Sequence, residues 1–194
     1  MNAFHCGSLG LIITGTVLAM SPATVSARLG ETAVQCANRY GPPKDSSSSN
    51  ILDKNSPLLE GAIHHTYEYQ GWKIRAAFLQ LDGPAVRIDY SKLGGDVVIK
   101  DYELQAIMTG NMSGTNWKQV PYSNPDSPNK WAAKVVESYF AGATGEKMWR
   151  RSDGAILWLR SNSIVRLELP AAREYETKLK ADKEQNARAS VPQF

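Results

Sequence analysis

Few residues in this sequence have types and spacing that could do chemistry. His64 and His65 are adjacent. In an extended segment, adjacent side chains point to opposite faces, so one metal ion could not readily take both, and tetrahedral zinc would need distant carboxylates or Cys36 as well. A Ser-His-Asp hydrolase would have to use one of the two histidines, yet the chain contains no Gly-x-Ser-x-Gly elbow. We therefore expect no metal site and assign no catalytic residue.

Cys36 and the segment 142–147 offer no stronger chemistry. Cys36 falls on the apolar stripe of an expected helix, and no neighbouring cation in the sequence would lower its pKa, so we expect a buried, unreactive thiol. The segment 142–147 reads Gly-Ala-Thr-Gly-Glu-Lys and lacks the Gly-Lys-Ser/Thr of a phosphate loop. Dinucleotide, Cys-x-x-Cys and calcium-loop patterns are missing too, so no cofactor is expected.

The acidic residues leave one enzymatic alternative open. Asp82, Asp89, Asp101 and Asp153 fall at turns, on a strand face or at a helix start, where structure alone accounts for them. Two carboxylates can nevertheless meet in three dimensions without any signature in the sequence. A small secreted hydrolase that uses such a pair is therefore the alternative to a binding protein.

Aromatic residues are the main candidates for recognition. The chain has more large aromatic side chains than a small sheet protein can comfortably bury, and exposed tryptophan and tyrosine beside basic residues are common in interfaces. We expect Trp72 and Trp158 to fill the core and Trp117, in a loop-like stretch, to be the most exposed. The candidate surface-recognition residues are Tyr67, Tyr69, Trp117 and Trp149.

Composition and the first 27 residues indicate where the protein acts. The 194 residues carry 22 basic and 19 acidic side chains, interspersed, and this net charge of +3 gives no reason to expect nucleic acid as a partner. Residues 1–27 contain no charged side chain except His5, and the apolar run from Leu9 to Met20 is too short to span a membrane. With small residues up to Ala27, this indicates a cleavable export signal, although a buried helix or a retained anchor are alternatives. The mature chain would begin at Arg28, have no transmembrane segment and be periplasmic or secreted.

Local patterns in the first half of the mature chain predict a helix followed by strands. The helix covers 30–41 and ends at Gly41 before two prolines. A polar loop, 44–57, follows, and Tyr67 and Tyr69 suggest a strand leading into a hairpin. That hairpin consists of strands 72–78 and 86–90 around the Asp82-Gly83 turn, with apolar residues on one face and charged residues on a wet face.

The second half shows the same order. A helix is expected over 101–109, a proline-rich loop over 121–130, and either a helix or a strand over 131–139. Strands then follow around Trp149, over 155–160 and over 164–169, with a turn at Asp153-Gly154. A solvated helix from Ala171 to about Ala187 closes the chain.

These elements predict an α+β fold: an antiparallel sheet of hairpins or a meander with short helices on one face, plus a C-terminal helix. We expect a signal peptide at 1–27, one domain at 28–187 and a flexible tail at 188–194. The domain could consist of two repeated halves, 28–93 and 99–170, because each has a helix closed by glycine, strands that open with an aromatic residue before a basic one, and an Asp-Gly turn.

Two motifs resemble known exported proteins. The start, Leu29-Gly30-Glu31-Thr32 with Gln35-Cys36 and Arg39-Tyr40-Gly41, resembles that of small uncharacterised exported bacterial proteins, and so does the segment 149–154, Trp-Arg-Arg-Ser-Asp-Gly. The arrangement of a helix before antiparallel strands is similar to the envelope-protein fold of the beta-lactamase-inhibitory-protein type, whose members bind other proteins. That likeness is architectural and implies no functional residue.

The sequence therefore favours an exported, non-enzymatic binding or envelope-associated module. Its expected partner is a protein or another component of the cell envelope, of unknown identity. The alternatives are the small hydrolase and a structural envelope protein. Neither the oligomeric state nor the redox state of Cys36 follows from the sequence.

Overall fold

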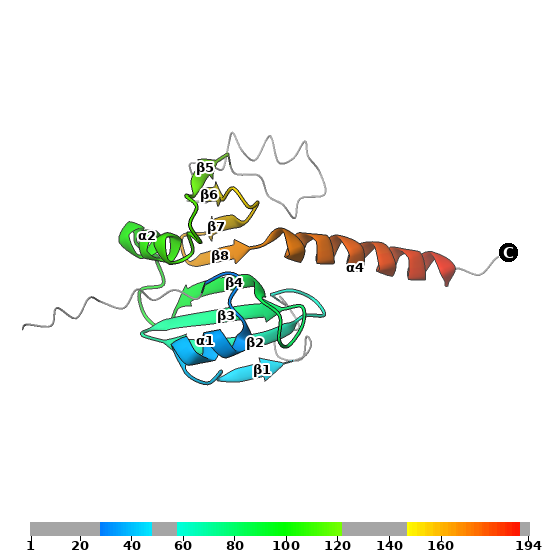
Figure 1. Cartoon of the computed structure of the whole chain (residues 1–194), viewed down its shortest axis with the longest axis horizontal. Coiled ribbons are helices and arrows are strands. Elements are labelled where there is room, and N and C mark those ends of the chain that lie inside the picture. Colours follow the sequence, from blue (N-terminus) through cyan, green and yellow to red (C-terminus); the bar gives the residue numbers. More distant parts are fainter. Residues whose placement is uncertain (1–27, 48–57, 122–146, 191–194) are drawn as a thin grey trace, which may run out of the picture.

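The computed structural model describes residues 28–47, 58–121 and 147–190. In these ranges eight strands form one open antiparallel sheet in the order β1-β2-β3-β4-β8-β7-β6-β5, and three helices accompany it (Figure 1). This is the predicted α+β fold. The strands are β1 (Asp45–Ser47), β2 (Ile63–Tyr69), β3 (Trp72–Phe78), β4 (Ala85–Lys92), β5 (Lys118–Val120), β6 (Lys147–Arg150), β7 (Ile156–Arg160) and β8 (Ile164–Glu168).

The first two helices form where local signals predict them. In α1 (Ala33–Tyr40), the Thr32 hydroxyl accepts a hydrogen bond from the Gln35 backbone N–H, and the Gln35 side chain accepts one from the Thr32 N–H. This reciprocal cap satisfies two N–H groups that a helix start leaves unpaired. Helix α2 (Asp101–Gly110) carries Asp101 and Glu103 in its first turn, where the helix dipole favours negative charge.

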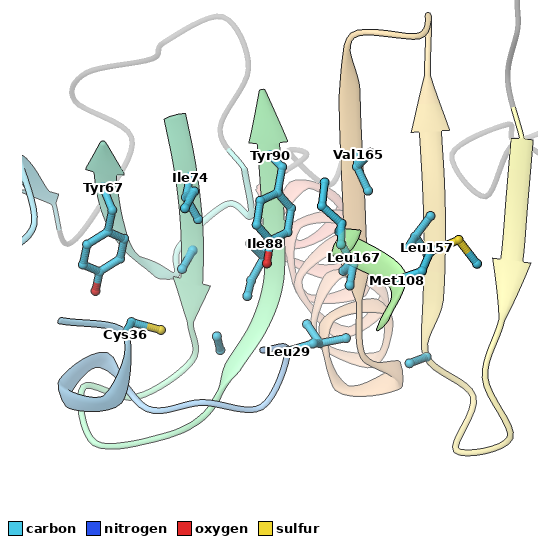
Figure 2. Packing of buried hydrophobic residues seen from close by; sticks show 14 of the residues in the cluster. Leu29, Cys36, Tyr67, Ile74, Ile88, Tyr90, Met108, Leu157, Val165 and Leu167 are labelled. Atoms are coloured by element: carbon cyan, nitrogen blue, oxygen red, sulfur yellow. The ribbon is translucent and has the colours of Figure 1, made fainter. Parts of the chain in front are cut away.

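Both helices cover the same face of the sheet. Cys36 and Tyr40 of α1 and Leu104, Ile107 and Met108 of α2 join the core cluster formed by the inward residues of β2, β3, β4, β7 and β8. Figure 2 shows Cys36 and Met108 on the same side of the sheet as Tyr67, Tyr90 and Leu167. We call this the helix face. One continuous apolar layer therefore joins the two ends of the sheet.

The third helix, α4 (Pro170–Ala189), packs on the opposite face, which we call the α4 face. Its buried residue Ala172 contacts the second cluster, which contains Leu58, Leu59, Ala62, Ala77 and Val86. Gly61 lets Tyr175 of α4 approach the same cluster, because its φ is +75° and a Cβ there would lie 2.5 Å from the Tyr175 hydroxyl oxygen. From Asp182 to Ser190 every residue is exposed, and this end of α4 projects beyond the sheet (Figure 1).

Among the described residues, the order of one helix followed by four strands occurs twice. The segment α1 to β4 is followed by the segment α2 to β8, and the last strands of the two segments, β4 and β8, pair antiparallel at the centre of the sheet. A common origin of the two halves stays a prediction.

The α4 face is not wet at its centre, and the prediction of a water-exposed charged face is wrong there. Arg87 and Asp89 point away from the helix face as predicted but are only 4% and 3% exposed. The cause is the pairing of β4 with β8, which places Arg87 opposite Glu168 and Asp89 opposite Arg166. The charged side chains therefore cover one another.

Three other differences concern element bounds. The three-residue strands β1 and β5 form the edges of the described sheet and lie where we predicted loop or no defined element. Helix α4 ends at Ala189, two residues inside the predicted tail. The segment 131–139 lies outside the described residues. Across the ranges that the structure describes, no helix is both long enough and apolar enough to cross a membrane.

Candidate functional site

The predicted recognition residue Tyr67 does not reach the surface. Its side chain is fully buried on the helix face, where its ring packs 5.6 Å from the ring of Tyr40. Placing Tyr67 on a recognition surface was therefore wrong, because the alternation of β2 directs it into the core. Tyr69 is half-buried at the end of the same strand and makes an edge contact with Tyr40 at 5.5 Å.

The two predicted tryptophans are also only partly exposed. The indole N–H of Trp117 donates to the Met108 carbonyl at 3.0 Å, and the Arg151 guanidinium lies 5.3 Å from the indole ring centre. Trp149 is half-buried and packs against the main core from β6. Trp117 is therefore less exposed than its loop-like sequence suggested, and these aromatic residues do not form one shared patch in the structure.

The two histidines form hydrogen bonds within the fold, and Cys36 is buried. His64 Nε2 lies 2.8 Å from the Leu59 carbonyl oxygen, whereas His65 Nδ1 lies 3.1 Å from the Tyr67 hydroxyl. Burial lowers the pKa of both imidazoles. Burial likewise raises the pKa of the Cys36 thiol to about 12, so the nucleophilic thiolate is disfavoured. In the described ranges no three side chains of His, Cys, Asp or Glu gather as metal ligands.

The carboxylates at the centre of the α4 face meet arginines. Asp89 accepts two hydrogen bonds from Arg166, both at 2.8 Å, and a third from Arg75 at 3.2 Å. These three residues are direct neighbours across β3, β4 and β8. Burial raises the pKa of Asp89, but the two guanidinium groups outweigh it and hold the pKa below its usual value.

A second cluster centres on Arg87 and ties α4 to the sheet. Its guanidinium lies 2.6 Å from Glu168 of β8, binds both carboxylate oxygens of Glu176 of α4, and donates to the Leu58 carbonyl at 2.7 Å. Burial raises the pKa of Glu168 despite Arg87 and Arg173. Glu168 and Glu176 do converge, as a hydrolase would need, but they converge on a cation that both of them bind. This geometry favours a structural role.

Exposed apolar residues, in contrast, gather in one segment. Six large apolar side chains among the described residues are strongly exposed. Three of them lie in the connection from β4 to α2, and a fourth is the second residue of α2. These four are Leu93 (40% exposed), Val97 (51%), Val98 (44%) and Tyr102 (73%). We call them the 93–102 surface. The other two, Val34 and Leu81, lie in α1 and at the β3–β4 turn.

Three connections hold this segment at one end of the sheet. The Leu93 N–H donates to the Gly71 carbonyl in the β2–β3 turn at 2.8 Å, and the Ile99 N–H donates to the Asn162 carbonyl in the β7–β8 turn at 2.7 Å. The Lys92 ammonium donates to the Val98 carbonyl at 2.9 Å and lies 6.0 Å from the Trp72 ring centre. The apolar side chains are thus exposed on a backbone that both halves of the sheet hold in place.

The charges around the 93–102 surface neutralise one another. Lys92 pairs with Glu103 at 2.8 Å, Lys100 with Asp96 at 3.1 Å, and Lys147 approaches Asp101 at 3.9 Å. With no excess charge of either sign in these pairs, the surface offers apolar contact with a balanced polar rim. Such a combination is typical of protein interaction sites.

The 93–102 surface was missed by the sequence analysis. Its signal was the apolar pair Val97-Val98 after Gly94-Gly95, outside any strand or helix pattern that would direct it inward. Comparisons of this chain with family models, with curated proteins and with solved structures found no match.

Proposed function

We propose that this protein is a non-enzymatic binding module of the cell envelope that recognises a protein partner through the 93–102 surface. The observation that carries the proposal is the clustering of Leu93, Val97, Val98 and Tyr102 in one exposed segment. Isolated exposed apolar side chains are ordinary on protein surfaces, whereas a contiguous group marks an interaction site.

The chemistry of the surface favours a protein over an anionic membrane. A membrane surface attracts an excess of lysine and arginine, but here Lys92, Lys100 and Lys147 each lie beside an acidic residue. An apolar patch of this kind suits an apolar segment of a folded protein, and Tyr102 is of the residue type that dominates binding energy at such contacts.

Site-specific photocrosslinking in the cells that produce the protein tests this proposal. A photoreactive phenylalanine analogue at position 102 should give a discrete protein adduct, because Tyr102 is 73% exposed and is the most exposed residue of the 93–102 surface. The matched control is the same analogue at position 81. Leu81 is 66% exposed and lies at the β3–β4 turn, away from the end of β3 that approaches the 93–102 segment.

The two positions make the outcome decisive. An adduct at 102 that is absent at 81, and that disappears when Val97 is replaced by Asp, supports the proposal. Equal adducts at both positions would show collision and not recognition, and no adduct at 102 would count against a protein partner.

Export belongs to the same proposal and rests on the apolar run and the small residues up to Ala27. Mass spectrometry of the protein from its native cells should find Arg28 as the first residue. Recovery of the chain with Met1 intact from the cytoplasmic fraction would refute export without bearing on the 93–102 surface.

A further inference from the structure

We propose a second binding site, in a groove on the α4 face beside β5 and β6, that takes the phosphate group of a small molecule or of a lipid headgroup. The groove has a volume of about 510 Å³, in the range of small-molecule sites. It is lined by Asn116, Lys118, Val120, Arg150, Arg151, Ser152 and Gly154. It does not depend on the 93–102 surface.

The groove holds a pair of cations for which the described part of the chain provides no carboxylate partner. Lys118 of β5 is the direct cross-strand partner of Arg150 of β6, so their side chains leave the sheet on the same side, and both are exposed. In the described ranges neither forms an ion pair with a carboxylate. Like charges directly opposite one another destabilise a sheet.

The charged residues paired directly across the central strands of this face have opposite signs. Arg87 faces Glu168, and Asp89 lies between Arg75 and Arg166. The pair at Lys118 and Arg150 departs from this pattern at the place where the surface is hollowed. A bound anion would remove the repulsion between these two cations, which no described carboxylate balances.

Arg151 forms the wall of the groove and supplies little free charge. Its guanidinium binds both carboxylate oxygens of Asp153, at 2.9 and 2.6 Å, and donates to the Asn111 carbonyl at 2.5 Å. These contacts fix the turn that carries Ser152 and Gly154. Counting only the side chains that the structure describes, the groove has about two free positive charges, from Lys118 and Arg150.

This charge selects the class of ligand. A phosphate monoester carries about −1.5 to −2 charges and three acceptor oxygens, so it can neutralise both cations, whereas a single carboxylate neutralises one. Ser152 and Asn116 add uncharged donors, and Val120 offers apolar contact to the group that carries the phosphate.

The test is a titration of the purified protein with three probes: inorganic phosphate, glycerol 3-phosphate, and vesicles of phosphatidylglycerol in phosphatidylcholine. The variant Lys118→Gln/Arg150→Gln should weaken binding at least tenfold. Its unfolding temperature should not fall, because the substitution removes a repulsion, and this separates loss of the site from loss of the fold. The control Lys178→Gln/Arg188→Gln removes the same two charge types from exposed positions of α4.

If either soluble phosphate probe binds the wild type and the control variant but not the groove variant, the ligand is a free phosphate compound. If only the vesicles bind, and only the groove variant loses that binding, the ligand is a lipid headgroup. Either of these two results supports the site. Three outcomes would overturn it: no binding of any probe, equal loss in the control variant, or equal affinity for acetate and phosphate at one ionic strength.

Discussion

Replacement of Arg87 by Met is expected to lower the free energy of unfolding by about 3–5 kcal/mol, the range for breaking a buried ion pair from one side. Arg87 is 4% exposed and is the common partner of Glu168, Glu176 and the Leu58 carbonyl. Methionine fills similar space but leaves the buried carboxylate of Glu168 without its nearest cation. Urea denaturation followed by circular dichroism measures the change.

The loss should be smaller in acid. Burial already raises the pKa of Glu168, and removal of Arg87 takes away a charge that opposes this increase. A raised folded-state pKa disfavours folding as the pH rises, so the variant should recover part of its deficit as the pH falls from 7 toward the unfolded pKa of glutamate, about 4.3. Burial raises the pKa of Glu176, but Arg87 outweighs burial and holds that pKa below its usual value. The wild-type protein therefore loses the contribution of the Arg87–Glu176 pair only as the pH falls below about 4.3, which narrows the difference further in that lower range.

The control is an exposed ion pair of the same chemistry. Arg188 pairs with Glu184 one turn away on α4, and both side chains are largely exposed. Arg188→Met should change stability by no more than about 0.5 kcal/mol. If Arg87→Met costs less than about 1 kcal/mol, the Arg87 cluster does not hold α4 to the sheet.

Leu167→Ala is expected to lower the free energy of unfolding by about 2–5 kcal/mol. Leu167 is fully buried on the helix face of β8, between its cross-strand neighbours Ile88 of β4 and Leu157 of β7. It therefore lies where the two halves of the sheet share one core. Leu179→Ala, on the half-exposed side of α4, should cost clearly less.

The same variant tests whether the halves are one domain. If the apolar layer is continuous across β4 and β8, tryptophan fluorescence and far-ultraviolet circular dichroism should report one coincident transition in the wild type and in Leu167→Ala. A variant that unfolds in two separate steps would mean that each half is stable alone and that the shared core contributes little.

The parts of this fold that depend on neighbouring residues could be predicted. The helix ending at Gly41, the helix starting at Asp101 and the β3–β4 and β7–β8 hairpins all have caps, turns and periodic patterns within a few residues. Their bounds agree with the prediction to within about three residues. Three-residue edge strands such as β1 and β5 are too short to show a period.

The pairing of β4 with β8 could not be predicted in the same way. It brings together residues about 77 positions apart, such as Asp89 and Arg166, and no local pattern encodes that register. The arginine–carboxylate clusters follow from it. The sequence correctly placed Arg87 and Asp89 on the face opposite their apolar neighbours, but their burial depends on the strand order.

At the candidate site, residue type gave a misleading prediction of which side chains are exposed. Aromatic residues were expected at the surface by residue type, but strand alternation and the packing of α1 decide that Tyr67 is buried and Tyr69 half-buried. The exposed residues Val97 and Val98 are of a type usually found inside. Their exposure follows from a connection held to two turns by its backbone, which residue type does not reveal.

The most direct test of the central claim is the affinity of the Val97→Asp variant for the partner captured at position 102, compared with that of Leu81→Asp. Each substitution introduces one carboxylate at an exposed apolar position, so their effects on solubility and net charge are matched. We expect at least a tenfold loss of affinity for Val97→Asp and wild-type affinity for Leu81→Asp. Unchanged affinity in Val97→Asp, or an equal loss in both variants, would contradict it.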